Sequence, residues 1–414
     1  MKIVIAPDSF KECLGAAEVA AVIAGELRAS ERAAGRPVCP PDVFAEGQGD
    51  PWEILECPLS DGGEGFVDIL SRHWGAEKVP VVVTGPLGVP VRAWYGKAGE
   101  TAIMDVASVC GLSLVPVAHR NPLHTTTRGL GELLLAAYRN GCRKALVGLG
   151  GSATCDGGAG LLEAEGPLAS GSPAVPVRAL AGRMEIRALC DVTNPFTGPQ
   201  GAARVFGPQK GADAAMVETL EERMEEMAGR IRRETGKDVR EMPGAGAAGG
   251  LAGALAAWFD AELLPGIDSM LSAVGFKDMI DGADLIITGE GKSDRQTLSG
   301  KAPLGVLKAA RQASCQLPNT QGACRLPDVQ VSCRLPDALG AEDCPDQGYG
   351  TRRRPVPVVL MSGVVEDREA LLRAGFSRVV QITPPSMPRD MAIRPETAAR
   401  HLRQAVARAD WLYI

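Results

Sequence analysis

The sequence predicts an α/β fold whose main sheet is mostly parallel. Short apolar runs typical of buried strands alternate with segments of helical periodicity, and glycine clusters follow several of these runs. The alternation is regular at both ends of the chain, whereas the middle mixes short β runs with helices. We therefore expect a discontinuous doubly wound domain, made of the N-terminal units and the residues after about 265, interrupted by a mixed α/β domain.

In the N-terminal half, apolar and β-branched runs bounded by turn residues predict the strands. The expected strands are 2–6, 53–58, 78–83, 91–95, 101–105, 144–149 and 186–190, and the expected helices are 15–28, 65–73 and 128–140. Residues 30–52 are polar and rich in proline and glycine, which predicts a surface loop.

In the C-terminal half, the apolar residues of 213–235 recur at helical spacing. The other expected elements are helices at 249–259 and 395–409 and strands at 284–288, 356–361 and 379–382. Residues 314–340 repeat a Cys-x-Leu-Pro pattern with a nine-residue period. Because single thiols nine residues apart form no preformed chelate, we interpret 314–355 as a low-complexity insertion between a helix and a strand rather than a metal-binding or docking loop.

The composition excludes several classes of protein. The 414 residues are 45% hydrophobic and carry a net charge of −6, so there is no general basic field for nucleic acid or an anionic membrane. No apolar run reaches the roughly 18 residues of a membrane span, and the run that ends at Pro7 is too short for a signal peptide. Eleven cysteines without metal-ligand spacing favour reduced thiols in the cytoplasm, and the presence of only four histidines argues against a histidine-rich metal site.

Polar segments follow the first two predicted strands. Ligands bind at the carboxyl ends of the strands in open α/β sheets, and Mg²⁺ uses one or two carboxylates with phosphate oxygens and water. The alternative is a helix cap and a left-handed turn with solvated acids. The candidates are Asp8, Ser9 and Lys11 after the first strand, and Asp61, Gly62, Gly63 and Glu64 after the second.

The richest glycine loop spans 148–160, between a predicted strand and a helix. It holds six glycines, two hydroxyl residues and one aspartate, and backbone donors at a helix start suit an anion such as a nucleotide phosphate. A purely structural loop rarely needs so many glycines, since each costs entropy on folding. The candidates here are Gly150, Gly151, Ser152 and Asp156.

Two weaker patterns lie in the middle of the chain. Asp191 and Asn194 follow a β run and place a carboxylate near an amide, although an Asx turn before Pro195 explains them equally well. Residues 243–250 contain a G-x-G-x-x-G without a convincing strand before it. We interpret this segment as a glycine-rich helix start that brings Gly246 and Gly249 close to a substrate or nucleotide.

The strand at 284–288 leads into the last candidates. Glu290 and Asp294 are expected to emerge beyond the strand, with Thr297 and Lys301 following. No Walker A motif, no H-R-D or D-F-G of protein kinases and no G-x-S-x-G elbow occurs in the sequence.

Taken together, these motifs resemble the type 1 glycerate kinase family. The matching segments, in collinear order, are APDSFKE (6–12), SDGGEGF (60–66), RNPLHTTTRGLGELL (120–134), LVGLGGSATCDGGAGLL (146–162), CDVTNPFTGPQGAA (190–203), FGPQKGA (206–212), PGAGAAGGLAGAL (243–255) and DLIITGEGKSDRQTLSGKAPLGV (284–306). The chain departs from the family at Cys155, where members commonly carry asparagine, and in the longer loops 30–52 and 314–355.

The resemblance implies ATP-dependent phosphorylation of D-glycerate with Mg²⁺, the 2-phospho product being favoured over the 3-phospho product. It also implies a flavodoxin-like domain at 1–76 and 265–414 and a restriction-enzyme-like mixed α/β domain at 77–264, with the site in the cleft between them. The net charge predicts no nucleic-acid or membrane partner, and the oligomeric state stays open.

Phosphoryl transfer requires an in-line hydroxyl, a metal-bridged triphosphate and cations around the equatorial oxygens. Lys11 and Lys301 are the candidates for binding phosphate or the glycerate carboxylate, and the acids are candidates for Mg²⁺ or for the hydroxyl proton. The expected catalytic residues are Lys11, Asp191, Glu290 and Lys301, and the expected metal ligands are Asp61, Glu64 and Asp294. The alternatives are a nucleotide-dependent dehydrogenase and a non-catalytic nucleotide- or metabolite-binding protein; NADH turnover or binding without turnover would identify them.

Overall fold

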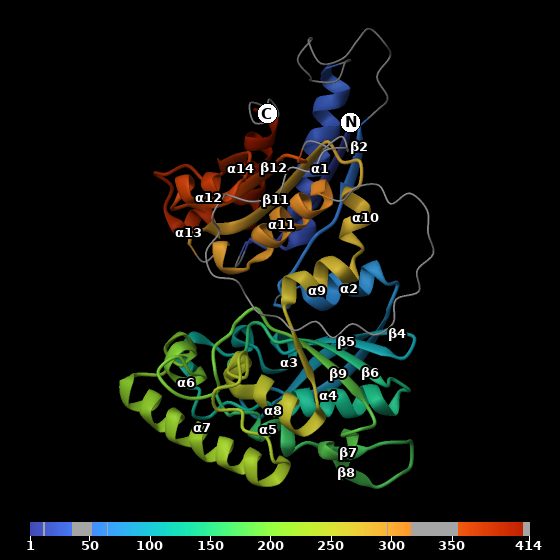
Figure 1. Ribbon diagram of the computed structural model, residues 1–414, viewed down its shortest axis with the longest axis vertical. Coiled ribbons are helices and arrows are strands. Elements are labelled where there is room, and N and C mark those ends of the chain that lie inside the picture. Colours follow the sequence, from blue (N-terminus) through green and yellow to red (C-terminus); the bar gives the residue numbers. More distant parts are fainter. Residues whose placement is uncertain (11–12, 35–51, 64, 296, 316–354, 409–414) are drawn as a thin grey trace, which may run out of the picture.

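The computed structural model describes residues 1–10, 13–34, 52–63, 65–295, 297–315 and 355–408. Two larger sheets and a small hairpin are flanked by helices, and both larger sheets contain parallel strands, which confirms the predicted α/β class. Figure 1 shows one sheet in the upper half of the molecule and the other in the lower half, with α2 (Phe66–His73) and α9 (Gly266–Ala273) between them.

Within the described residues, the first sheet has five strands, all parallel, in the order β13-β12-β11-β1-β2. Their bounds are β1 Lys2–Pro7, β2 Glu53–Glu56, β11 Leu285–Ser293, β12 Val358–Val365 and β13 Arg378–Gln381. After β2 the chain leaves this sheet, and it returns as β11 on the other side of β1. The carboxyl ends of β1 and β11 therefore form a topological switch point, which is where ligands bind in such sheets.

Side-chain alternation along β1 explains why helices cover both faces of this sheet. Ile3 and Ile5 pack on one face with α1 (Ala16–Ala34) and α14 (Pro395–Ala407). Val4 and Ala6 pack on the other face with α2, α9 and α11 (Ala302–Cys315). Because both faces of β1 are buried, its sequence is a continuous apolar run rather than an alternation of apolar and polar residues.

The second sheet has six strands in the order β10-β9-β6-β5-β4-β3. Strands β3 (Glu77–Thr84), β4 (Pro90–Ala98) and β5 (Thr101–Asp105) form an antiparallel meander. The remaining pairs are parallel: β5 with β6 (Lys144–Gly148), β6 with β9 (Glu185–Leu189), and β9 with β10 (Glu262–Leu264). The hairpin pairs β7 (Glu165–Pro167) with β8 (Ala174–Pro176).

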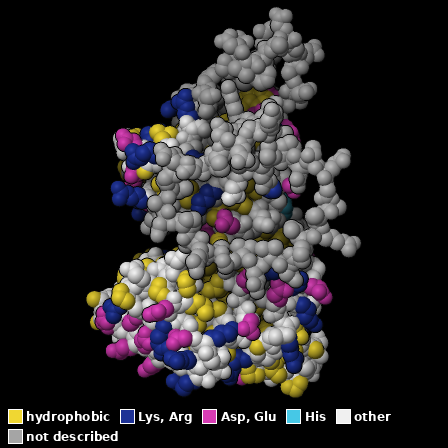
Figure 2. Space-filling model, viewed as in Figure 1, with side chains coloured by type: hydrophobic (Ala, Val, Ile, Leu, Met, Phe, Trp, Pro, Cys, Tyr) yellow, Lys and Arg dark blue, Asp and Glu magenta, His cyan; other side chains and the backbone are white. Residues whose placement is uncertain are grey.

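Helices α4 (Arg128–Arg139) and α8 (Leu251–Phe259) pack in the core of this second sheet. The long helix α7 (Ala214–Thr235) lies at its outer side, at the lower left of Figure 1. Figure 2 shows acidic and basic side chains intermingled on this part of the surface, where Arg204 pairs with Glu218 and Arg230 with Glu234.

The structure corrects two expectations about element boundaries. Helix α1 continues to Ala34, so residues 30–34 are helical and do not belong to a loop; residues 35–51 lie outside the described residues. Strand β11 does not end at Thr288 but pairs with β12 as far as Ser293. The expected insertion at 314–355 lies almost entirely outside the described residues, because α11 includes 314 and 315 and the description resumes at 355.

Several short helices had no counterpart in the sequence expectations. They include α9, α10 (Phe276–Ile280), α12 (Arg368–Ala374) and α13 (Arg389–Ala392). The division into domains at 1–76 plus 265–414 and 77–264 stays a prediction, although the strands of the two sheets fall into those two groups.

Candidate active site

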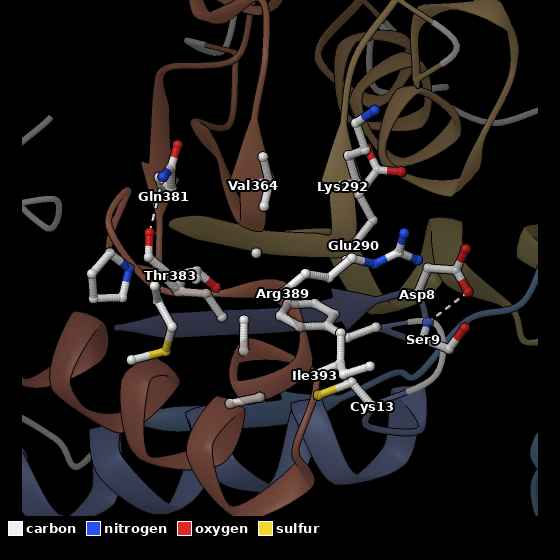
Figure 3. A pocket seen from close by; sticks show the side chains of 18 of the residues that line it. Asp8, Ser9, Cys13, Glu290, Lys292, Val364, Gln381, Thr383, Arg389 and Ile393 are labelled. Carbon is white, nitrogen blue, oxygen red and sulfur yellow. Dashed lines mark hydrogen bonds between the residues drawn. The ribbon is translucent and has the colours of Figure 1, made fainter.

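The larger of two adjoining cavities, cavity A, lies at the carboxyl ends of β1, β11 and β12 and has a volume of about 710 Å³. Asp8, Ser9, Asp61, Glu290 and Lys301 line it, together with residues from the C-terminal segment 381–398. Figure 3 shows Asp8, Ser9, Glu290 and Lys292 on one side, Gln381 and Thr383 on the other, and Arg389 pointing across toward Asp8 and Glu290. Five residues expected from the sequence to form the site therefore share one cavity.

Glu290 lies within β11, not beyond its end as the sequence suggested, because pairing with β12 continues through it. Its carboxylate accepts hydrogen bonds from the hydroxyls of Ser293 (2.9 Å) and Thr297 (2.6 Å). Burial raises the pKa of Glu290, and the two hydroxyls and Lys301 partly oppose that shift. Thr297, expected as a binding residue, thus orients Glu290.

Lys301 lies at the rim of cavity A. Its ammonium nitrogen is 3.8 Å from Glu290 Oε2 and 3.9 Å from Asp294 Oδ1, and its side chain is 30% exposed. These long separations leave the ammonium group able to bind an anion in the cavity. Asp294 also lies 3.6 Å from Lys292, so it faces two cations, and it does not line cavity A.

Asp61 lines both cavity A and the smaller cavity B, which has a volume of about 360 Å³. Its Oδ1 accepts a hydrogen bond from the backbone N–H of Gly63 at 3.1 Å. The neighbouring glycines permit close packing: Gly62 has a φ of 91°, and a Cβ on Gly150 would lie 2.5 Å from Gly63 Cα. Gly62 and Gly63 therefore bring the loop after β2 against the loop after β6.

Cavity B contains the expected residues Gly150, Gly151 and Ser152 from the loop after β6, and Asp191 from the end of β9. Leu149, Leu189, Phe206 and Ala248 provide apolar lining. Ala248 adopts a left-handed backbone conformation (φ 52°), which is unusual for a residue with a side chain. The cavity is thus a small chamber with both apolar and polar lining.

Asp191 has the most unusual carboxylate of the site. Its Oδ1 accepts backbone hydrogen bonds from Gly266 (2.7 Å) and Ile267 (3.3 Å) at the start of α9. Its Oδ2 is buried and has no hydrogen-bond partner among the described residues. Burial, with a smaller contribution from Asp61, raises the pKa of Asp191 from 3.8 to about 7, even though the two N–H groups oppose the shift.

Lys210 lies in cavity B and was not among the candidates from the sequence. It follows α6 (Ala202–Phe206) in the segment Phe206–Ala212, and its residue is only 4% exposed. Its ammonium group donates to Ser152 Oγ (2.9 Å) and to the carbonyl of Thr154 (2.6 Å). Burial lowers the pKa of Lys210. Nothing in its local spacing pointed to Ser152, which is 58 residues away.

Besides Gly62, Gly63, Asp294 and Thr297, four further expected residues do not line cavity A or cavity B. The carboxylate of Asp156 accepts hydrogen bonds from Thr127, Gly158 and Gly160 and thereby fixes the start of α5 (Ala159–Leu162). Asn194 donates to the carbonyl of Gln200. Gly246 and Gly249 pack against backbone, since a Cβ would lie 2.2 Å from Pro195 O and 1.9 Å from Thr154 O. Packing therefore accounts for these two glycines without a ligand.

Of the remaining candidates, two line cavity A and two lie outside the described residues. Asp8 and Ser9 line cavity A, where the backbone N–H of Ser9 donates to Asp8 Oδ1 at 2.6 Å. Lys11 and Glu64 lie outside the described residues, so their expected roles stay predictions. Arg389, Gln381 and Thr383 of cavity A were missed because the C-terminal segment carries no glycine-rich motif.

No group of three or more His, Cys, Asp or Glu suited to a metal ion occurs in the described part of the chain. A divalent cation bound mainly through phosphate oxygens needs only one or two protein carboxylates. Asp61, at the junction of the two cavities, fits that requirement; Asp294, beside two lysines and outside cavity A, fits it less well.

Cations and carboxylates surround a cavity at a switch point, and the adjoining chamber is lined by a carboxylate with one oxygen unpaired among the described residues. These are the parts that phosphoryl transfer requires. The glycine pattern at 244–250 does not support a dehydrogenase, because residues 236–246 ahead of it, all described, contain no strand. The fold and the site thus define an α/β phosphotransferase.

Comparison with known proteins specifies the family. The model of the glycerate kinase family matches residues 3–331. The chain is 44% identical to a glycerate kinase of Bacillus subtilis (strain 168) and 41% identical to a glycerate 2-kinase of Escherichia coli (strain K12), in each case over 75% of this chain and 82% of the relative. A crystal structure described as that of a putative glycerate kinase 2 from Salmonella typhimurium LT2 matches with a TM-score of 0.70 and 33% identity, covering 99% of this chain and 97% of the other. The chain belongs to the glycerate kinase family.

Within the described residues, no helix is both long enough and apolar enough to cross a membrane.

Proposed function

We propose that this protein transfers the γ-phosphoryl group of ATP to the 2-hydroxyl of D-glycerate, which yields 2-phospho-D-glycerate and ADP. The observation that carries the proposal is the carboxylate of Asp191, a residue that lines cavity B and whose buried Oδ2 has no hydrogen-bond partner among the described residues. Asp61, whose charge acts on Asp191, lines both cavities. A nucleotide in cavity A and an acceptor in cavity B would meet at Asp61.

The sizes of the cavities favour this arrangement. Cavity A, at about 710 Å³, lies within the range of roughly 300–1,000 Å³ that holds drug-sized ligands, and a nucleotide is of that size. Its apolar C-terminal wall, with Pro384, Met387 and Ile393, suits a base, while its charged end at β1 and β11 suits phosphates. Cavity B is half as large and suits a three-carbon acid.

Asp191 is the proposed general base. Its raised pKa, about 7, means that it can accept the proton of the attacking hydroxyl near neutral pH. The two N–H groups at the start of α9 hold Oδ1 and leave Oδ2 as the atom that accepts the proton. As the hydroxyl attacks, Oδ2 takes its proton and the bond between the γ-phosphorus and the β–γ bridging oxygen of ATP breaks.

Lys301 is the proposed cation for the transferred phosphoryl group, with Lys11 beside it as a prediction from the sequence alone. Lys301 lines cavity A and holds Glu290 only loosely. Glu290, fixed by two hydroxyls, orients Lys301 and contributes negative charge that a metal ion would neutralise. Arg389 adds positive charge from the C-terminal wall.

Mg²⁺ is the proposed metal; when bound, it would neutralise negative charge on the phosphates during transfer. Asp61 would hold it, with Glu64 and Asp294 as the further candidates from the sequence. We also propose cytoplasmic localisation, the domain boundaries given above, and no nucleic-acid or membrane partner.

The choice of the 2-hydroxyl rests on the relative from Escherichia coli, which is named a glycerate 2-kinase and is 41% identical. Phosphorus NMR distinguishes the products directly. A phosphate on C2 couples to one carbon-bound proton and gives a doublet, whereas a phosphate on C3 couples to two and gives a triplet.

The testing experiment combines that spectrum with ADP release from ATP, Mg²⁺ and D-glycerate. ADP release in step with a doublet supports the proposal. A triplet would move the attacking hydroxyl to C3, and NADH-linked turnover of glycerate without ATP would replace the kinase by a dehydrogenase.

A further inference from the structure

Lys210 is a buried cation without an acidic partner. Its residue is 4% exposed, and its ammonium group donates to one hydroxyl and one backbone carbonyl and lies beside the thiol of Cys155, so no carboxylate is among its hydrogen-bond partners. Among the described residues, Lys210 forms no ion pair, and Asp156 is already satisfied by Thr127 and by two backbone N–H groups. Burying a charge in this way is costly unless an anion compensates it.

The missing anion has room in cavity B, which Lys210 lines together with Ser152 and Asp191. The hydroxyl of Ser152 accepts a hydrogen bond from Lys210, so its own proton is directed away from the lysine. An anion that contacts Lys210 can therefore also receive a hydrogen bond from Ser152. Cavity B is thus lined by a cation and a hydroxyl donor, from Lys210 and Ser152, and by the carboxylate of Asp191, whose Oδ2 has no hydrogen-bond partner among the described residues.

We propose that Lys210, together with the hydroxyl of Ser152, binds the carboxylate of the acceptor substrate and so restricts this site to hydroxy acids. The inference rests on the proposed function, in which Asp191 accepts the proton of the substrate hydroxyl. A hydroxy acid satisfies both ends of cavity B at once, because its carboxylate pairs with the buried ammonium group and its hydroxyl meets Asp191. A polyol leaves Lys210 without an anion.

This assignment separates the roles of two lysines. Lys301 lines cavity A and has carboxylates 3.8 and 3.9 Å away, whereas Lys210 lines cavity B and has none among the described residues. Lys301 therefore serves the phosphates and Lys210 the acceptor.

The decisive experiment compares the KM values for D-glycerate and for ATP in the wild type, Lys210→Met and Lys301→Met. Losing one partner of a buried charge pair typically costs at least about 2 kcal/mol, so Lys210→Met should raise the KM for glycerate by about 30-fold or more. The KM for ATP should stay within about twofold. Lys237→Met is the matched control, because Lys237 pairs with Asp260 at the far end of α7.

The wild type provides a readout that does not depend on the folding of a variant. D-Glyceramide has the shape of D-glycerate but no charge, and glycerol lacks the carboxyl group. We expect both to be phosphorylated with a kcat/KM lower by about 30-fold or more than that of glycerate. In Lys210→Met, the kcat/KM values for glycerate and for the two uncharged substrates should be closer together than in the wild type. Lys210→Arg keeps the positive charge and should preserve more of the preference for glycerate. Thermal melts show that each variant is folded.

The outcomes separate the two proposals. Absence of ADP release from wild-type protein with D-glycerate would overturn the proposed function and this inference with it. Normal wild-type turnover, with glyceramide used as well as glycerate, would overturn only the role of Lys210. So would a folded Lys210→Met that changes the KM for ATP alone, or a Lys301→Met that raises the KM for glycerate instead.

Discussion

At the scale of single residues, the site places Asp191 where its ionised form is destabilised. Its Oδ2 is buried without a partner among the described residues and Asp61 adds negative charge nearby, so the structure stabilises the protonated form. The sequence placed Asp191 among the candidates because it follows a β run, but spacing alone could not distinguish a base from an Asx turn. In the structure Oδ1 accepts hydrogen bonds from the start of α9, 75 residues away, rather than from a local turn.

Asp191→Asn should lower kcat by about 10²–10⁴-fold, the usual contribution of a general base. In the wild type, kcat/KM should rise with pH, reach half of its maximum near pH 7 and level off at higher pH, because only the ionised carboxylate accepts the proton. The measurement is a pH–rate profile of ADP release. The control is Asp268→Asn, a change at an exposed position of α9, the helix whose start binds Asp191; its kcat should stay within about twofold of the wild-type value. Equal losses of kcat in both variants would contradict the role of Asp191.

The substitution Asp191→Asn should also stabilise the folded protein above pH 7. The folded-state pKa of Asp191, about 7, exceeds its ordinary 3.8, so its contribution to stability is fully present below pH 3.8 and is lost as pH rises through 7. The amide side chain of the variant cannot ionise and avoids that loss. Melting temperatures should therefore show Asp191→Asn above the wild type at pH 8.5, with a smaller difference at pH 5. A constant difference would mean that Asp191 is not destabilised by ionisation.

Asp61→Asn tests the metal assignment. Even outer-shell partners of a metal are typically worth 10–100-fold in affinity, so loss of a direct carboxylate should raise the Mg²⁺ concentration for half-maximal activity at least about tenfold. Chelation by EDTA should abolish wild-type turnover, and added Mg²⁺ should restore it. Full activity in EDTA, or an unchanged Mg²⁺ requirement in Asp61→Asn, would remove Asp61 from the metal site.

At the scale of elements, the sequence predicted the buried strands well because their apolar runs are continuous. It could not predict that β11 continues through Gly289 and Glu290 to Ser293, because only the partner strand β12 sustains those residues in β conformation. It also gave no expectation for α9. This helix is short, and its importance comes from a tertiary contact: its first N–H groups bind Asp191. Local periodicity carries no information about such a contact.

Gly266→Ala tests the start of α9. A Cβ at residue 266 would lie 2.3 Å from Asp61 O and 2.5 Å from Asp191 Oδ2, so it would displace both acids. Since a misplacement of about 1 Å at a reacting group can cost about 10²-fold, kcat should fall by that order. Gly25→Ala in α1 is the matched control, with no atom within 4 Å of its Cβ: it should raise stability by about 0.5–1 kcal/mol and leave activity unchanged. Wild-type kcat in Gly266→Ala would show that the acids tolerate the added methyl group.

At the scale of the whole molecule, the two sheets share apolar contacts as well as a site. Ile103 of β5 and Leu189 of β9 belong to the same buried cluster as Phe66 of α2 and Ile267 of α9, which cover the first sheet. The sequence predicted two groups of elements from the change in strand pattern, but it could not show that their cores are continuous. Continuity through α2 and α9 also holds Asp61 and Gly266 beside Asp191.

We therefore expect the two sheets to unfold together. Ile103 is 0% exposed, and truncating a buried isoleucine to alanine typically costs about 2–5 kcal/mol. Hydrogen exchange measured by mass spectrometry should show Ile103→Ala reducing the protection of β1 and of β6 by the same factor, about 30-fold or more, because both strands then exchange through one global opening. Val82→Ala, at a position that is 65% exposed on β3, should change neither. Loss of protection in β6 alone would mean that the second sheet opens independently of the first sheet.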